Sequence, residues 1–283
     1  MLALAWVAVG LAAEPSPALP GVGAAPEELR AVAAEVRDQP LAERVGAISA
    51  VLLGRPYVND PMGEGAGHDA DPLARYDQFD CLTFAEEVYS FALAADPVDA
   101  ARIRDAMRYG PGPLDYAHRR HFMELQWIPG NVADGWLRLT TTEYGDTVTL
   151  RKTVDDATWR GWSARKDFAM TDEELPVGEM VLDVLPLDEA LRVADTIRPG
   201  SLILTVRTDR SGVPLWTTHV SLLVPKEGGG TVLRHATKIG NGGTKDHDFR
   251  WYLEHLKTYR WPVAGIAVME PVEQGPRMAA MAR

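Results

Sequence analysis

The 283-residue sequence contains a single cysteine, Cys81. One cysteine excludes an intramolecular disulfide framework, and it excludes a structural zinc site built on several thiolates. A chain of this length forms a large enough hydrophobic core to fold without such cross-links. Because a free cysteine is commonly a small buried hydrophobic residue, the context of Cys81 must decide whether it has a chemical role.

The sequence also lacks any dense cluster of lysine and arginine, and its formal net charge is −11. A nucleic-acid backbone requires concentrated positive charge, so no nucleic-acid partner is expected. No HExxH or similar metal-ligand signature occurs, and we therefore expect neither a metal nor another cofactor. A metal hydrolase that uses His219, His235, His247 and an aspartate remains an alternative.

Long apolar runs are absent except at the start, where residues 1–13 read MLALAWVAVGLAA. This run is too short to span a bilayer, and no later segment reaches the roughly 18 apolar residues of a membrane helix. It has the length of a signal peptide and ends in small residues, which predicts cleavage after Ala12 or Ala13. We therefore expect a secreted or periplasmic protein with no integral membrane segment, although a buried N-terminal helix is an alternative.

The remainder divides into a flexible leader over residues 14–25, rich in Pro, Ala and Gly, and a single catalytic domain over residues 26–283. The domain begins with a helical portion, because apolar residues recur at helical spacing twice within residues 26–53. A long loop over residues 55–80 follows. Its aromatic residues indicate order, and ordered loops of this length are usually functional.

Helices come first in the domain and strands later, which predicts an α+β fold with an antiparallel sheet. Helical periodicity covers residues 81–95 and about 98–109, and a further strand is predicted near residues 147–154. The predicted sheet strands are SLILTV (201–206), WTTHVSLLV (216–224), TVLRHAT (231–237) and GIAVME (265–270).

Cys81 stands at the first turn of its predicted helix, directly after the capping residue Asp80. Free N–H groups and the helix dipole lower the pKa of a thiol at this position. The same N–H groups are suited to an oxyanion hole. The position therefore predicts a nucleophilic cysteine.

Two histidines are candidates to activate this thiol. His219 lies within an apolar strand 138 residues after Cys81, and His235 follows 16 residues later on the next strand. Such a separation between cysteine and histidine occurs in papain-type enzymes. A hairpin would make the two histidines neighbours, so that His235 orients the His219 ring.

The segments DCLTFAEEV (80–88), IRPGSLILTV (197–206), THVSLLV (218–224) and LRHAT (233–237) together resemble the NlpC-like branch of papain-like cell-wall hydrolases. More specifically, GRPYVNDPMGEG (54–65), YDQFDCLTF (76–84) and RRHFMELQWIPGN (119–131) resemble the N-acetylmuramoyl-L-alanine amidase-like family. The resemblance implies a papain-like fold with the cysteine at a helix N-terminus packed on the sheet. It also implies hydrolysis of the amide between N-acetylmuramic acid and L-alanine in peptidoglycan or its muropeptides.

Carried over by position, the resemblance makes Cys81 the nucleophile, His219 the general base and then acid, and His235 the orienting residue. Tyr57 is a candidate for the oxyanion hole or for substrate contact. Further candidates for substrate contact on the sugar side are Arg119, His121, Trp127 and Asn131.

The sequence departs from these patterns at two places. Arg120 stands where the family has Asn, and Leu82 and Thr83 stand where the general NlpC-like motif has Ser and Gly. The second departure argues against recognition of a free peptide amine beside the cysteine. A cell-wall peptide endopeptidase of the same fold and a non-catalytic wall-binding module remain the alternatives.

Overall fold

The computed structural model describes residues 22–274. The predicted signal peptide and its cleavage site lie outside the described residues. At the described end of the predicted flexible leader, the Gly23 N–H donates to the Ala74 carbonyl at 2.8 Å, and Val22 forms an isolated bridge with Arg75. Residues 22–25 are thus held by the 55–80 loop, a long-range contact that composition does not reveal. Within the described residues no helix is long and apolar enough to cross a membrane.

A six-stranded antiparallel sheet forms the centre of the described chain, in the order β1-β8-β4-β5-β6-β7. Its strands are β1 (Leu137–Leu139), β4 (Leu202–Arg207), β5 (Thr217–Pro225), β6 (Thr231–Thr237), β7 (Gly243–His247) and β8 (Val263–Pro271). The four strands predicted for the sheet correspond to β4, β5, β6 and β8, and their antiparallel pairing confirms the predicted α+β class. The edge strands β1 and β7 were not predicted, because they are short and β7 follows a glycine-rich turn.

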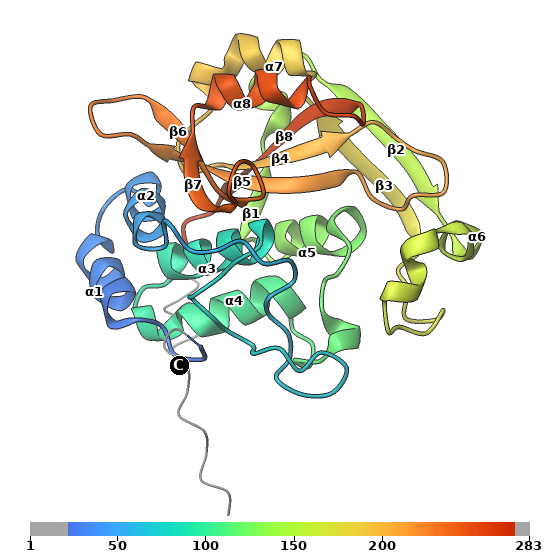
Figure 1. Cartoon of the computed structure of the whole chain (residues 1–283), viewed down its shortest axis with the longest axis horizontal. Helices are drawn as coiled ribbons and strands as arrows, with labels where there is room; N and C mark the ends of the chain where they lie inside the picture. Colours follow the sequence, from blue (N-terminus) through green and yellow to red (C-terminus); the bar gives the residue numbers. More distant parts are fainter. Residues whose placement is uncertain (1–21, 275–283) are drawn as a thin grey trace, which may run out of the picture.

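Helices from the first half of the chain cover one face of this sheet (Figure 1). They are α1 (Glu27–Val36), α2 (Leu41–Val51), α3 (Cys81–Leu93), α4 (Ala100–Tyr109) and α5 (Ile128–Ala133). The first four match the predicted helical segments to within a few residues. Prolines directly precede α1 and α2, where the missing N–H of proline costs nothing at a helix start.

The opposite face of the sheet is covered by α7 (Leu187–Val193) and α8 (Phe249–Leu256) (Figure 1). Strand alternation divides the side chains between two apolar clusters. Leu204 and Leu222 belong to the cluster that contains the α3 side chains, whereas Leu223 and Leu233 pack with α7 and α8. Sheet residues of both parities are therefore buried, and this explains the almost continuous apolar runs of β4 and β5.

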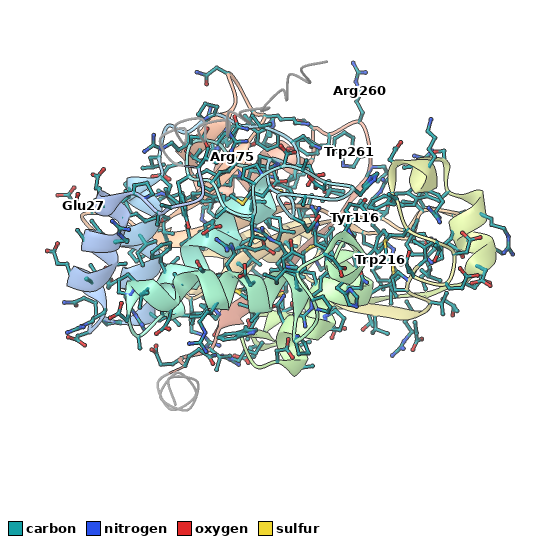
Figure 2. All side chains as sticks on the ribbon, turned by 90° about the horizontal axis from the view of Figure 1, so that it is seen from below. Glu27, Arg75, Tyr116, Trp216, Arg260 and Trp261 are labelled. Carbon is teal, nitrogen blue, oxygen red and sulfur yellow. The ribbon has the colours of Figure 1, made fainter. Side chains whose placement is uncertain are left out.

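Residues 114–196, where the sequence indicated little beyond one strand, include a separate two-stranded sheet. That strand is β2 (Val148–Val154), and it pairs antiparallel with β3 (Gly178–Val184). The short helix α6 (Asp156–Gly161) directly follows β2 in the chain. In Figure 2, seen from below, α3, α4 and α5 form a band between α1 at one end and α6 at the other.

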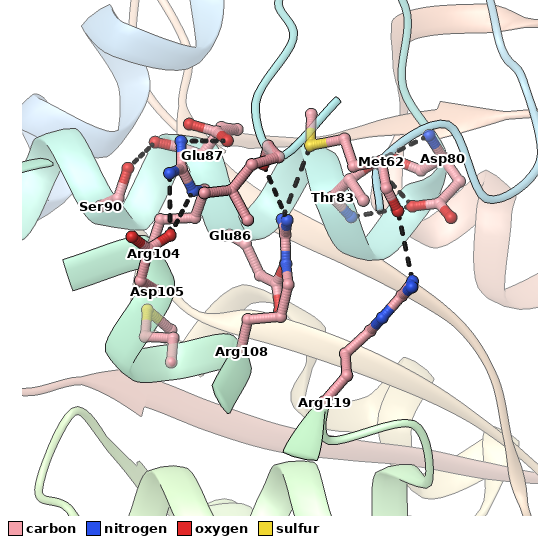
Figure 3. Close-up of polar contacts among 12 residues, drawn as sticks. Met62, Asp80, Thr83, Glu86, Glu87, Ser90, Arg104, Asp105, Arg108 and Arg119 are labelled. Atoms are coloured by element: carbon pink, nitrogen blue, oxygen red, sulfur yellow. Dashed lines mark hydrogen bonds and ion pairs between the residues drawn. The ribbon is translucent and has the colours of Figure 1, made fainter. Parts of the chain in front are cut away.

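Two buried ion pairs join α3 to α4 (Figure 3). The Glu86 carboxylate accepts a hydrogen bond from Nε of Arg108 at 2.8 Å and one from the indole N–H of Trp127 at 2.8 Å. The next residue, Glu87, lies 3.5 Å from Arg104, which precedes Arg108 by one turn of α4. Because all four charged side chains are buried, each depends on its partner for compensation. These pairs fix the orientation of the helix that begins with Cys81.

Replacement of Glu86 by alanine is therefore expected to destabilise the fold strongly, because the guanidinium of Arg108 would stay buried without its partner. Removing one member of a buried pair typically costs about 3–5 kcal/mol of unfolding free energy. Urea denaturation followed by circular dichroism measures this loss. Glu43→Ala, at an exposed position on α2, is the matched control and should change stability by less than about 0.5 kcal/mol. Equal denaturation midpoints for both variants would contradict the expected role of the pair.

Candidate active site

Cys81 is the first residue of α3, at the point where the 55–80 loop ends. Asp80 caps the helix: its carboxylate accepts a hydrogen bond from the Thr83 N–H at 2.8 Å, and the Thr83 hydroxyl faces the Asp80 N–H at 3.1 Å. The second carboxylate oxygen of Asp80 accepts from the Asp60 N–H at 3.2 Å. This reciprocal capping box fixes the start of the helix and holds the loop against it.

The thiol of Cys81 is not ionised at rest, contrary to the expectation from its helix position. Burial raises its pKa to about 12, and the carboxylate of Asp80 acts in the same direction. Backbone hydrogen bonds from Val220, Cys81 and Leu82 lower the pKa but do not outweigh these effects. The helix start thus provides the expected N–H groups, but it also carries an anionic cap. The thiol needs a base to remove its proton at the moment of attack.

His219 lies on β5, opposite Thr205 of β4, and its side chain is half-buried. Burial lowers the pKa of His219 to about 4, and the nearby His247 contributes to the shift. The ring is therefore neutral near pH 7 and has a nitrogen available to accept a proton. Val220, the next residue on the strand, is the one whose N–H faces the Cys81 sulfur. The thiol therefore lies against the backbone of β5 at the residue next to His219.

His235, on the neighbouring strand β6, is completely buried against His219. Nε2 of His219 and Nδ1 of His235 are 2.8 Å apart, and the hydroxyl of Ser221 lies 3.0 Å from the same His235 nitrogen. In the described chain, Nδ1 of His219 makes no hydrogen bond, and the structure gives none between the thiol and this ring. The contact with His235 thus occupies one side of the His219 ring and leaves the other side open.

Tyr57 is the loop residue that the structure places beside the thiol. It forms an isolated bridge with Phe79 near the end of the loop. Burial raises the pKa of its hydroxyl, and the charges of Cys81 and Asp80 raise it further. The group is consequently a neutral hydrogen-bond donor at any physiological pH. The ammonium of Lys238 lies over its ring, 5.1 Å from the centroid.

Of the four residues predicted for the sugar side, Arg119 and His121 line a pocket with Leu82 and Thr83 at the start of α3, whereas the other two lie inside the protein. Trp127 and Asn131 are fully buried, and the side-chain amide of Asn131 donates to the Met107 and Trp127 carbonyls at 3.1 and 2.8 Å. Both belong to the core, so the prediction that they contact substrate is corrected. Their spacing near the end of the matching motif reflects the packing of α5, which the sequence pattern alone does not distinguish from a site.

Arg119 and His121 also have internal partners. The guanidinium of Arg119 makes two hydrogen bonds to Glu64, at 2.8 and 2.9 Å, and one to Asp69 at 2.5 Å. Nε2 of His121 lies 2.6 Å from the Tyr116 carbonyl, and burial lowers the pKa of this histidine to about 4. Arg119 therefore anchors the 55–80 loop, and His121 belongs to an aromatic cluster beneath it.

Three site residues were not predicted as such. Ser221 is two positions after His219 and therefore on the same face of β5, a pattern visible in the sequence. His247, on β7, lies with Nδ1 2.8 Å from Nε2 of His235. The three histidines form a line of hydrogen bonds. Within residues 22–274 no three His, Cys, Asp or Glu side chains converge as metal ligands would.

The third is Glu124, on a π-helical turn (Met123–Trp127). Its buried carboxylate accepts hydrogen bonds from the backbone N–H groups of Trp216 and Thr217, at 3.2 and 2.5 Å. These contacts fix the start of β5 two residues before His219. Single π-helical turns are frequent at functional sites, but no sequence pattern predicted this turn.

Comparison with known proteins gives the family. The model of a family described as N-acetylmuramoyl-L-alanine amidase-like matches residues 47–259, about three quarters of the chain. A search of curated proteins found no match. Because the matched range includes Cys81, His219, His235 and His247, the whole site lies inside the family region.

Solved structures of low sequence identity share the fold. A Legionella pneumophila protein is 20% identical with a TM-score of 0.75, and the match covers 87% of this chain and 93% of that one. An N-acetylmuramoyl-L-alanine amidase from Bacteroides uniformis is 19% identical with a TM-score of 0.64, covering 82% and 99%. A Bacteroides fragilis protein provisionally named a xylanase is 21% identical with a TM-score of 0.60, covering 78% and 98%. By its family match, this chain belongs to the N-acetylmuramoyl-L-alanine amidase-like family.

Proposed function

We propose that this protein is a cysteine amidase that hydrolyses the amide between the lactyl group of N-acetylmuramic acid and L-alanine in peptidoglycan fragments. The observation that carries the proposal is the hydrogen-bonded pair His219–His235, with Cys81 at the start of α3 and its sulfur against the N–H of Val220. His235 occupies Nε2 of His219 at 2.8 Å, which leaves Nδ1 for the thiol proton. A nucleophile, a base and a residue that orients the base are the parts that acyl transfer requires.

The chemistry follows from these positions. The Cys81 sulfur attacks the lactyl carbonyl carbon as its proton passes to Nδ1 of His219. The tetrahedral intermediate collapses when His219 returns this proton to the leaving nitrogen of L-alanine. Water then attacks the thioester, with His219 again as base, and releases the muramic acid carboxylate. Tyr57 is suited to donate a hydrogen bond to the oxyanion, because its hydroxyl is neutral and lies beside the thiol.

The surroundings of Cys81 favour the sugar-linked amide over a bond within the peptide. Recognition of a free peptide amine at this place would require an available acceptor. Both carboxylate oxygens of Asp80 accept internal hydrogen bonds, and the hydroxyl of Thr83 takes part in the same capping box. A positively charged amine would therefore have to displace the contacts that begin α3. An amide carries no positive charge and therefore does not need such an acceptor.

Digestion of a muramyl pentapeptide, followed by mass spectrometry of the products, tests the proposal. An amidase releases N-acetylmuramic acid with a free lactyl carboxylate, together with a peptide that begins with free L-alanine. Cys81→Ala is the control and should release neither. A product in which L-alanine stays attached to the sugar would instead identify a cell-wall endopeptidase. Binding without any cleavage would favour a non-catalytic wall-binding module.

The substrate implies a location in the cell envelope, and we propose export by cleavage after Ala12 or Ala13. The apolar run at residues 1–13 motivates this proposal. N-terminal sequencing of the protein from the envelope fraction should begin at Ala13 or Glu14. A cytoplasmic protein that retains Met1 would contradict it.

A further inference from the structure

Three imidazole rings lie in a row across three consecutive strands of the sheet. His219 is on β5, His235 on β6 and His247 on β7. Nε2 of His219 lies 2.8 Å from Nδ1 of His235, and Nε2 of His235 lies 2.8 Å from Nδ1 of His247. Neighbouring rings are steeply inclined, at 72° and 84°. The row joins the half-buried His219 to the edge of the sheet.

Hydrogen bonding couples the protonation of all three rings. A neutral imidazole has one N–H, so it donates at one nitrogen and accepts at the other. For Nδ1 of His219 to be the base, its N–H must be on Nε2 and donate to His235. His235 must then carry its own N–H on Nε2 and donate to Nδ1 of His247. The tautomer of His219 thus depends on whether His247 accepts, two strands away, together with the Ser221 hydroxyl that lies 3.0 Å from Nδ1 of His235.

The same row transmits a proton. When Nδ1 of His219 takes the thiol proton, its Nε2 proton moves to Nδ1 of His235, and the Nε2 proton of His235 moves to Nδ1 of His247. Each ring gains one proton and gives one away, except His247, which then holds both N–H groups and the positive charge. The three transfers run in reverse when His219 protonates the leaving amine.

The outer end of the row is the best place for this charge. His235 is completely buried, whereas His247 is partly exposed to solvent. The His247 ring stacks on the indole of Trp251, with centroids 4.9 Å apart and planes inclined by 21°. A cation over an indole face is stabilised by the quadrupole of the ring. Hydration and the Trp251 face therefore both favour an imidazolium at His247 over one at His235.

Several charged groups surround His247. Lys245 is on its own strand and donates to the Ile239 carbonyl and to Asn241. Asp246 pairs with Arg234 of β6. His255 of α8 also stacks on the indole of Trp251, with centroids 4.8 Å apart.

Burial lowers the pKa of His247, Lys245 and His255 lower it further, and Asp246 opposes them. The pKa of His235 is lowered well below its usual value, first by burial and then by its neighbours. The proton therefore passes through His235 and does not rest there.

We propose that His247 is a positioning residue of this site, which fixes the tautomer of His219 through His235 and takes the positive charge that forms when the Cys81 thiol is deprotonated. The proposal rests on the proposed function for its role in turnover. Its effect on the thiol itself does not depend on any substrate.

Two substitutions separate the two roles. In His247→Gln, the amide oxygen still accepts from His235, so the tautomer is kept, but the side chain cannot take a proton. In His247→Phe, the stack on Trp251 is kept and the acceptor is lost as well. We expect kcat to fall about tenfold in the first variant and about 10²-fold in the second, with KM changed less than about twofold. The acid limb of the kcat profile should also shift.

His118→Gln is the matched control. This exposed histidine pairs with Asp115 and lies outside the row, so its substitution should leave kcat and its pH profile unchanged. Near-ultraviolet circular dichroism of each variant verifies packing. If His247→Phe fails to fold, His247→Gln alone decides, because it keeps the hydrogen bond to His235. Unchanged kcat and pH profile in a folded His247→Gln would overturn the charge-accepting role.

Alkylation of the single cysteine by iodoacetamide provides a readout without substrate. The alkylation rate of Cys81 at pH 7 should fall about tenfold in His247→Phe and remain unchanged in His118→Gln. If this holds while the wild-type protein cleaves no muramyl amide, the proposed function fails and the inference stands. If the wild-type protein cleaves the amide and the His247 variants match it in kcat, pH profile and alkylation, the inference is overturned.

Discussion

Replacement of Cys81 by alanine is expected to lower kcat by about 10⁴-fold or more while substrate affinity changes little. The substitution removes the attacking atom but leaves the capping box of Asp80 and Thr83 in place. Loss of a nucleophile from a catalytic triad has an effect of this order, and the residual rate comes from binding and oxyanion contacts. Steady-state kinetics on a muramyl peptide and calorimetric titration with the same compound measure the two quantities.

Cys81→Ser makes the test more stringent. A hydroxyl has a much higher pKa than a thiol and is a far weaker nucleophile, so this variant should be nearly as inactive as the alanine variant. Thr196→Ala, at an exposed position shortly after α7, serves as a control and should keep the wild-type rate. Wild-type turnover by Cys81→Ala would show that the cysteine mechanism is wrong. If a chelator then abolished that activity, the result would indicate a metal mechanism that uses the histidines as ligands.

His219→Ala is expected to lower kcat almost as much, by about 10³-fold or more, because the thiol would lose its base. The pKa of Cys81 is raised to about 12, so almost no thiolate exists near pH 7 without proton transfer to a partner. His235→Ala should cost less, because His235 orients the base and does not touch the substrate. His118→Ala, an exposed histidine that pairs with Asp115, is the control and should not alter the rate. A ranking in which His235→Ala is the more damaging variant would contradict these roles.

The pH profile of the wild-type enzyme reports the same base. His219 accepts a proton only when it is neutral, and its pKa is lowered to about 4. The acid limb of kcat/KM is therefore expected near pH 4, well below the usual histidine value of about 6.5. An acid limb near pH 6.5 in a folded sample would show that the group titrating in this limb is not His219 with its lowered pKa.

Folding must be followed in the same experiment. The unfolded chain binds protons at His219 and His235 below about pH 6.5, whereas the folded chain does not until the pH is much lower. Because the unfolded state binds more protons in this interval, the free energy of unfolding falls as the pH falls from about 6.5. Circular dichroism at each pH separates loss of fold from loss of the neutral base.

The elements with strong local signals could be predicted from the sequence. The capping residue Asp80 and the periodic apolar face after it predicted α3. The apolar runs predicted four strands of the sheet. The edge strand β7 has no such run, because Lys245, Asp246 and His247 are polar residues that are partly buried or exposed at the sheet edge. His247 could therefore be named only as a candidate metal ligand, and its contact with His235 depends on the strand order.

The 119–131 segment shows a second limit of prediction from sequence, in which a binding surface was predicted for residues that belong to the core. Their polar and aromatic character suggested a binding surface, but the amide N–H groups of Asn131 and the indole N–H of Trp127 have their partners inside the protein. A buried polar side chain with internal partners has the same sequence signature as one that binds a ligand. The reversed pKa shift of Cys81 has a similar origin, since burial depends on the tertiary packing around the helix start.

The most direct test of the central claim is the mass of the protein during turnover. The wild-type enzyme, mixed with excess muramyl pentapeptide and quenched in acid within milliseconds, should carry a muramyl-lactyl acyl group on the peptide that contains Cys81. The group should be absent from Cys81→Ala and accumulate in a folded variant with slowed deacylation. A peptidyl group on Cys81 would contradict amidase specificity. Rapid turnover with no adduct on Cys81 under any quench condition would contradict covalent catalysis by this thiol.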